Sequence, residues 1–126
     1  MALSVLLVDD SKFVRKAMRK ELDSIFRGKE VEFDEAGNGN EALELIFNEP
    51  YDLILLDLTM PEKTGYDVLE ILKDKGIRRN IIVLTADIQP EAEKIVRDLG
   101  AVGYMRKVKP FDSAGFEEIL RGIDLI

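Results

Sequence analysis

Short apolar runs alternate along the whole chain with segments in which apolar residues recur every three or four positions. Residues 4–8, 31–36, 53–56, 81–84 and 102–107 have the length and composition of β-strands. The run at 53–56 is the most hydrophobic, which predicts a strand buried on both faces at the centre of a sheet. Apolar and acidic residues alternate at 31–36, which predicts a more exposed strand.

The segment after each run predicts a helix, because its apolar residues fall on one helical face. Ser11 stands where it would cap the first helix, and Pro90 where it would open the fourth. The third and fourth helices are expected to end at Gly76 and Gly100, and the second before Pro50. The five predicted apolar faces are Val14, Met18 and Leu22; Ala42, Leu45 and Ile46; Val68, Leu69 and Leu72; Ala92, Ile95, Val96 and Leu99; and Phe116, Ile119, Leu120 and Ile123.

Five strand–helix units in succession, without repeats or linkers, predict one α/β domain over residues 1–126. Its architecture would be (βα)5, a doubly wound parallel five-stranded sheet with helices on both faces. Because crossovers between parallel strands are right-handed, the carboxyl ends of all strands meet at one edge. Ligands of such sheets bind at that edge.

Polar residues follow the predicted strands at this edge. A sequence without histidine or cysteine leaves carboxylates, hydroxyls, lysines and backbone to do any chemistry. Clustered carboxylates repel one another unless they share a cation, and carboxylate oxygens suit a hard ion such as Mg²⁺. A neighbouring lysine and hydroxyl suit phosphoryl oxygens, so the set predicts phosphoryl transfer onto a carboxylate. Its members are Asp9, Asp10, Asp57, Thr85, and Lys107 or Lys109.

The charge balance narrows the possible partners. A formal net charge of −7 argues against a nucleic-acid-binding or membrane-surface protein, since both need a basic field. No targeting or membrane-spanning segment is visible, so a cytoplasmic protein is expected. One basic stretch in the first helix is open to two interpretations, a solvated face or a kinase-docking surface: Lys12, Arg15, Lys16, Arg19 and Lys20.

The order and spacing of these motifs resemble the response regulator receiver domains of two-component signalling, in particular the single-domain chemotaxis type. The resemblance implies a flavodoxin-like sheet with the strand order 2-1-3-4-5. It covers essentially the whole chain, which ends just after the last predicted helix. Two interpretations follow: output is a binding event on a partner, or the chain is cut from a larger protein. The matching motifs are Val8-Asp9-Asp10-Ser11, Asp57-Leu58-Thr59-Met60-Pro61, Gly65, Leu84-Thr85-Ala86, Gly100-Ala101-Val102-Gly103-Tyr104 and Lys109-Pro110-Phe111.

The resemblance also implies a role for each matching residue. Asp57 would accept a phosphoryl group from the phosphohistidine of a sensor histidine kinase. Mg²⁺ would be bound by Asp57, by Asp10 directly, by Asp9 directly or through water, and by the backbone carbonyl of Thr59. Thr85 would then hydrogen-bond the phosphoryl group, and the rotamer of Tyr104 would change. A downstream protein would bind the face formed by the fourth helix, the fifth strand and the last helix.

The last strand departs from the family pattern. The family follows the tyrosine with two residues, then lysine and proline, whereas here Val108-Lys109 separates Lys107 from Pro110. Insertions are better tolerated in a loop than in a strand, which favours Lys107 as the phosphate-binding lysine. The position before the proline favours Lys109. The family's lysine–proline bond is commonly cis, and the insertion leaves both isomers open here.

Three functions are compatible with these residues. The first is a phosphorylation-dependent signalling switch that is not an enzyme beyond Mg²⁺-dependent self-phosphotransfer and autodephosphorylation. The second is a phosphohydrolase with an aspartyl-phosphate intermediate, whose best-known class needs an acid/base aspartate where Thr59 stands. The third is a receiver-like interaction domain that is never phosphorylated, which the intact acidic set disfavours.

Overall fold

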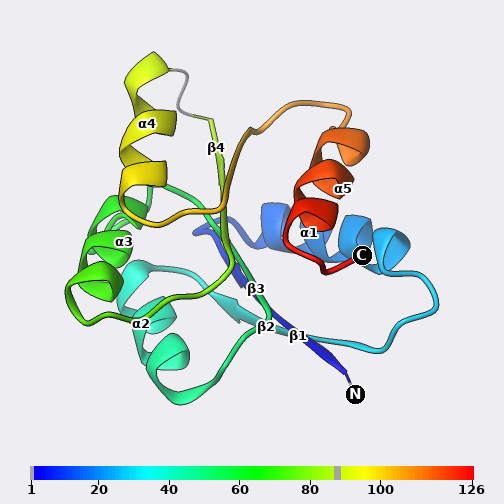
Figure 1. Ribbon diagram of the computed structural model, residues 1–126, viewed down its shortest axis with the longest axis horizontal. Helices are drawn as coiled ribbons and strands as arrows, with labels where there is room; N and C mark the ends of the chain where they lie inside the picture. The colour runs from blue at the N-terminus through cyan, green and yellow to red at the C-terminus, as the bar shows by residue number, and fades with distance from the viewer. Residues whose placement is uncertain (1, 87–88) are drawn as a thin grey trace.

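Strands and helices alternate strictly along the chain in a computed structural model that describes residues 2–86 and 89–126 (Figure 1). The strands are β1 (Leu3–Val8), β2 (Val31–Ala36), β3 (Leu53–Leu56), β4 (Ile81–Thr85) and β5 (Gly103–Arg106). The helices are α1 (Lys12–Ile25), α2 (Gly39–Asn48), α3 (Gly65–Asp74), α4 (Pro90–Asp98) and α5 (Ser113–Gly122).

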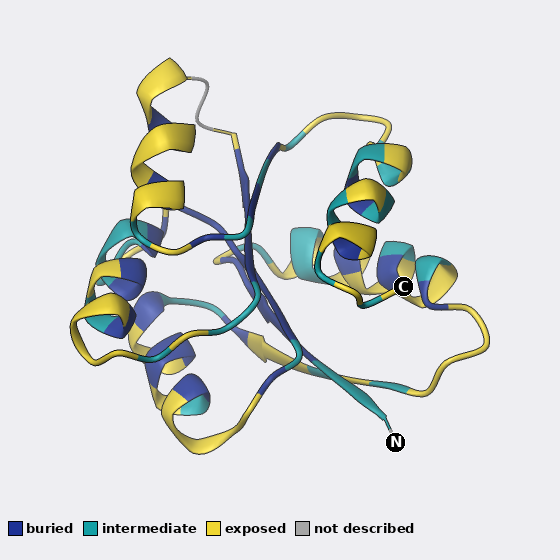
Figure 2. Ribbon diagram, in the orientation of Figure 1, coloured by how far each residue is buried: buried dark blue, intermediate teal, exposed yellow. Residues whose placement is uncertain are grey.

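The five strands form one parallel sheet in the order β2-β1-β3-β4-β5, which confirms the predicted fold class and strand order. All four residues of the central strand β3 are buried. Burial of a leucine or isoleucine side chain contributes about 1.5–3 kcal/mol. The strand that precedes Asp57 is therefore firmly anchored on both faces. The edge strand β2 is more exposed, as its alternating pattern predicts (Figure 2).

Helices cover both faces of the sheet (Figure 1). On one face α1 and α5 pack through residues such as Leu22 and Phe116, and on the other α2, α3 and α4 pack through residues such as Ile46, Leu69 and Val96. Successive residues of each inner strand enter opposite cores, because side chains alternate along a strand. Among the described residues, no helix combines the length and apolar character needed to span a membrane.

The helix ends follow the predicted signals. The Ser11 hydroxyl accepts a hydrogen bond from the Val14 N–H at 3.2 Å, and Pro90 is the first residue of α4. Gly76 and Gly100 follow α3 and α4 with φ of 70° and 107°. Such positive values are readily adopted only by glycine, so these residues can end the helices without strain.

Two expectations about α4 and β5 are wrong in detail. Ile95 was expected on the buried face of α4, but it is 44% exposed. The face that α4 buries is narrow, with Ala92 and Val96 its only buried residues in the described part of the chain. The last strand was expected over 102–107, but β5 spans only Gly103–Arg106.

Candidate functional site

The carboxyl ends of β1, β3 and β4 bring Asp9, Asp57 and Thr85 to one edge of the sheet. Their exposed fractions are 5%, 4% and 0%. Among the residues that the structure describes, these three are the ones with polar or charged side chains that are buried. Buried polar side chains are costly unless they are paired. Their concentration at one edge, while the rest of the core is apolar, marks this edge as the functional site.

Asp9, Asp10 and Asp57 form an acidic cluster at this edge. One carboxylate oxygen from each lies within 4.8 Å of the others, and Asp10 is exposed to solvent. The pKa of Asp57 is raised to about 6, mainly because burial disfavours its charged form; the charge of Asp9 adds to the rise, while Lys107 and a backbone hydrogen bond from Thr59 oppose it. The ionised form of Asp57 is thus unfavourable without more positive charge. This donor set, made only of carboxylates and backbone oxygens, fits a hard cation such as Mg²⁺.

The backbone around Asp57 is fixed from two sides. The Asp57 N–H donates to the carbonyl oxygen of Val8 at 3.0 Å, which extends the β1–β3 pairing by one residue. The amino end of α3 then packs directly against this segment. A β-carbon at Gly65 would overlap the carbonyl oxygen of Asp57, so only glycine allows this close approach. Gly65 therefore allows the amino end of α3 to pack against the backbone of Asp57 and Leu58.

Both carboxylate oxygens of Asp9 already accept hydrogen bonds. Its Oδ1 accepts from the Ser11 N–H at 2.9 Å, and its Oδ2 accepts from Lys107 Nζ at 2.6 Å. The Asp9 N–H donates to the Ala36 carbonyl oxygen at 3.1 Å. Asp9 is therefore held in place, whereas Asp10 faces solvent and has a carboxylate open to a ligand.

The structure places Lys107, and not Lys109, against the acidic cluster. Lys107 Nζ lies 2.6 Å from Asp9 Oδ2 and 3.5 Å from Asp57 Oδ1. Burial lowers the pKa of Lys107, but its hydrogen bond to Asp9 and the charges of both aspartates outweigh burial, so the pKa is raised. The ammonium group is thus kept charged.

The two inserted residues lie outside the strand. The Lys107 N–H still donates to the Thr85 carbonyl oxygen at 2.7 Å, so register with β4 continues through Lys107. Lys109 has left this register, and its Nζ lies 5.8 Å from the ring centroid of Phe13. The Lys109-Pro110 peptide bond is cis.

Thr59 and Tyr104 are the two remaining residues to which the resemblance gives a role. The Thr59 N–H hydrogen-bonds the Asp57 carboxyl group, and its side chain is exposed. Tyr104 is half-buried, packs against the core on the α2–α4 side, and lines a groove of about 410 Å³ on the α4–β5–α5 face. Tyr104 therefore contacts both the hydrophobic core and the groove on that face.

Arg15 contacts the site, whereas the sequence placed it in a basic stretch that was open to two interpretations, a solvated face or a kinase-docking surface. Its side chain is only 11% exposed, and its guanidinium donates to the Asp9 backbone carbonyl. The helical spacing of Arg15 is the same as that of the neighbouring bases of α1, so no local pattern in the sequence distinguishes it from them.

Fold and site together define a receiver domain. The family model of the response regulator receiver domain matches residues 5–121, and the chain belongs to this family. Receiver domains are signalling domains that take a phosphoryl group from histidine kinases and act on downstream targets, and they generally bind Mg²⁺ at an acidic site. The predicted recognition and general function are therefore confirmed.

Individual relatives agree with this assignment. The chain is 39% identical over 111 residues to chemotaxis protein CheY of Halobacterium salinarum, covering 88% of each protein. It is 33% identical over 123 residues to transcriptional regulatory protein DltR of Streptococcus agalactiae, but it spans only 51% of that protein. The structure of response regulator TrrA of Thermotoga maritima, in complex with Mg²⁺ and beryllium fluoride, matches with a TM-score of 0.79 and 31% identity, covering 96% and 98% of the two chains.

Proposed function

We propose that this chain is a Mg²⁺-dependent switch in which Asp57 is the phosphoryl acceptor. The observation that carries the proposal is the buried Asp57 carboxylate at the end of the central strand, beside two further aspartates and the Lys107 ammonium group. The cognate donor would be the phosphohistidine of a sensor histidine kinase. The proposal includes the cytoplasmic location expected from the sequence.

Some residues would bind the cation directly and others through water. Asp10 and Asp57 would contact Mg²⁺ directly, together with the Thr59 carbonyl oxygen. Asp9 would act through water, because both of its carboxylate oxygens already accept hydrogen bonds. When bound, Mg²⁺ supplies charge neutralisation for the carboxylates and the incoming phosphoryl oxygens.

Phosphoryl transfer then needs few groups from the protein. A carboxylate oxygen of Asp57 forms a bond to phosphorus while the bond from phosphorus to the donor histidine nitrogen breaks, and that nitrogen keeps the electron pair. Lys107 and the Thr85 hydroxyl bind the phosphoryl oxygens. Slow loss of the phosphoryl group to water would reset the switch.

Output would pass through Thr85 and Tyr104 to the α4–β5–α5 face. Thr85 ends β4 in the core, and Tyr104 lines the groove on this face. Bonding of Thr85 to a phosphoryl oxygen would favour a conformer in which Tyr104 moves inward, which changes the surface that a downstream protein binds. Phosphorylation would act by shifting a pre-existing population, as local charge switches do.

The phosphohydrolase alternative lacks support at one position. Such an enzyme needs an acid/base group two residues after the nucleophile, and the exposed Thr59 side chain cannot serve. The alternative of an unphosphorylated interaction domain does not explain why Asp9 and Asp57, two carboxylates, are buried together at one edge of the sheet at a cost in stability.

We expect the wild-type protein to gain the mass of one phosphoryl group when it is incubated with Mg²⁺ and acetyl phosphate at neutral pH. Intact-mass spectrometry measures the gain, and excess EDTA should abolish it. A phosphohydrolase would instead release inorganic phosphate catalytically from simple phosphomonoesters. Failure to label under any Mg²⁺ concentration would contradict the proposed function.

Mg²⁺ should also raise the melting temperature, because it binds the folded acidic cluster and relieves its repulsion. At a free concentration about ten times Kd the expected stabilisation is ~1.4 kcal/mol. This corresponds to a melting-temperature increase of ~4–6 °C for a domain of this size. Asp10→Ala should lose most of the increase, whereas Asp98→Ala on α4 should keep it. A melting temperature that does not respond to millimolar Mg²⁺ would contradict the assigned ligands.

A further inference from the structure

Arg15 joins the acidic site to two neighbouring elements. It lies in the first turn of α1, and its Nη1 donates to the backbone carbonyl oxygen of Asp9. Its Nε donates to Glu35 Oε1 on β2 at 2.7 Å. The Arg15 side chain is 11% exposed, and its bond to the Asp9 carbonyl oxygen is partly buried, an environment in which charge-assisted hydrogen bonds are strong. The bond to Glu35, whose side chain is 36% exposed, lies nearer the solvent.

The carbonyl that Arg15 binds belongs to the peptide unit between Asp9 and Asp10. Because a peptide unit is planar, holding this oxygen restricts the orientation of the unit and with it the position of the Asp10 Cα, from which the Asp10 side chain extends. The other end of Asp9 is fixed by its N–H bond to the Ala36 carbonyl oxygen on β2. Glu35, the residue before Ala36, holds the guanidinium itself.

We propose that Arg15 is a positioning residue for the Mg²⁺ site, acting through the Asp9–Asp10 peptide. The inference rests on the proposed function, since it assigns Asp10 to the cation. Groups that orient metal ligands commonly change metal affinity by about 10–100-fold when they are removed. Arg15 has the geometry of such a group, because it touches the ligand's backbone and is itself anchored by Glu35.

The sign of the effect separates positioning from simple electrostatics. Arg15 is a cation close to a cation site, so its charge alone disfavours Mg²⁺. If only charge mattered, removing the guanidinium would tighten Mg²⁺ binding. If Arg15 positions Asp10, removing it weakens Mg²⁺ binding despite the loss of a repulsive charge.

The test is an NMR titration with Mg²⁺ that follows the amide signals of the site in Arg15→Met, which keeps the length and apolar character of the side chain. We expect Kd to rise about 10-fold or more. Arg19→Met is the matched control, because Arg19 also approaches Glu35, at 3.9 Å, but is 51% exposed. The control should bind Mg²⁺ as the wild type does.

Two further variants separate positioning from a general structural role. Arg15→Lys should recover part of the affinity, because its ammonium group can donate to the same carbonyl oxygen. Glu35→Ala should weaken Mg²⁺ binding in the same direction, by releasing the guanidinium. If Arg15→Met does not fold, these two variants decide the question, and wild-type affinity in both would overturn the proposal.

The outcomes also distinguish this inference from the proposed function. If the wild type binds Mg²⁺ and labels, but Arg15→Met binds equally or more tightly, the positioning role alone is overturned. If the wild type does not bind Mg²⁺, the proposed function fails and the positioning role fails with it.

Discussion

The Asp57→Asn variant is expected to gain no phosphoryl group from acetyl phosphate under conditions that label the wild-type protein fully. The amide of asparagine has nearly the same shape as the carboxylate but is a poor nucleophile, and it removes one charge from the acidic cluster. Intact-mass spectrometry is the measurement. The loss should be complete and not graded, because the Asp57 carboxylate is the group that forms the new bond to phosphorus and asparagine has no carboxylate.

The fold should survive this substitution. The pKa of Asp57 is raised to about 6 from an ordinary value of 3.8, so its ionisation in the metal-free folded state costs stability as pH rises through this range. A neutral asparagine avoids this cost. Asp57→Asn should therefore melt no lower than the wild type in EDTA at neutral pH.

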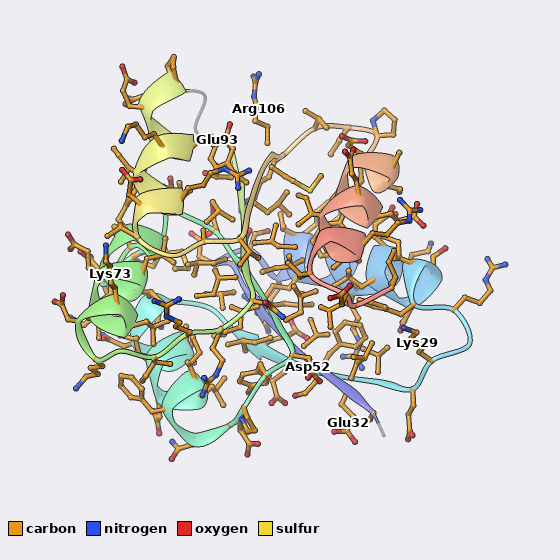
Figure 3. All side chains as sticks on the ribbon, in the orientation of Figure 1. Lys29, Glu32, Asp52, Lys73, Glu93 and Arg106 are labelled. Atoms are coloured by element: carbon orange, nitrogen blue, oxygen red, sulfur yellow. The ribbon has the colours of Figure 1, made fainter. Side chains whose placement is uncertain are left out.

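Asp52→Asn supplies the matched control for the acceptor. Asp52 precedes β3 and lies at the amino end of the strand that Asp57 follows (Figure 3). Its Oδ2 accepts a hydrogen bond from the Ser4 N–H at 2.8 Å, far along the strand from the cluster. This variant should label normally. Wild-type labelling of Asp57→Asn would show that the acceptor lies elsewhere.

Lys107→Ala should separate phosphorylation from its structural consequence. The variant keeps the nucleophile and the carboxylates, so it should still label at Asp57. It loses the ammonium group 3.5 Å from Asp57 Oδ1, the group placed to bind a phosphoryl oxygen. We expect most of the phosphorylation-induced change on the α4–β5–α5 face to disappear, as measured by amide chemical shifts.

Lys109→Ala tests whether Lys109, and not Lys107, binds the phosphoryl group. Its Nζ lies over the exposed Phe13 ring and away from the carboxylates, so the response to phosphorylation should stay near that of the wild type. Equal losses in the two variants would contradict the assignment of Lys107. A larger loss in Lys109→Ala would reverse it.

The sequence predicted the sheet well because local patterns and chain topology agree. The buried run before Asp57 and the glycines after α3 and α4 are strong signals, and right-handed crossovers leave few arrangements of five alternating units. The strand order itself came from the family resemblance. The convergence of Asp9, Asp10 and Asp57 follows from the sheet topology, since each residue closely follows a strand.

Other features depend on tertiary packing that no local pattern specifies. The choice between Lys107 and Lys109 depends on where β5 leaves the sheet, and alternation alone puts both lysines on one face. Arg15 shares its spacing with solvated bases of α1, and only the return of the helix over the end of β1 buries it. Ile95 fits the apolar period of α4 but lies beyond the narrow strip that the helix buries.

The surface around Ile95 combines exposed apolar and charged side chains. Ile95 and Val108 are exposed apolar residues, and Glu93 and Arg106 are exposed charged residues on the neighbouring α4 and β5 (Figure 3). Glu93 Oε2 accepts a hydrogen bond from Arg97 Nε at 3.0 Å on the same helix.

The most direct test of the switch is an amide-resolved NMR comparison of the wild-type protein with Mg²⁺ alone and with Mg²⁺ plus beryllofluoride, which mimics the phosphoryl group on Asp57. We predict shifts at Asp57 and Thr85 that continue through Tyr104 to α4, β5 and α5, while β2 and α2 stay unchanged. Shifts confined to the loop around Asp57, with none on the α4–β5–α5 face, would contradict the account.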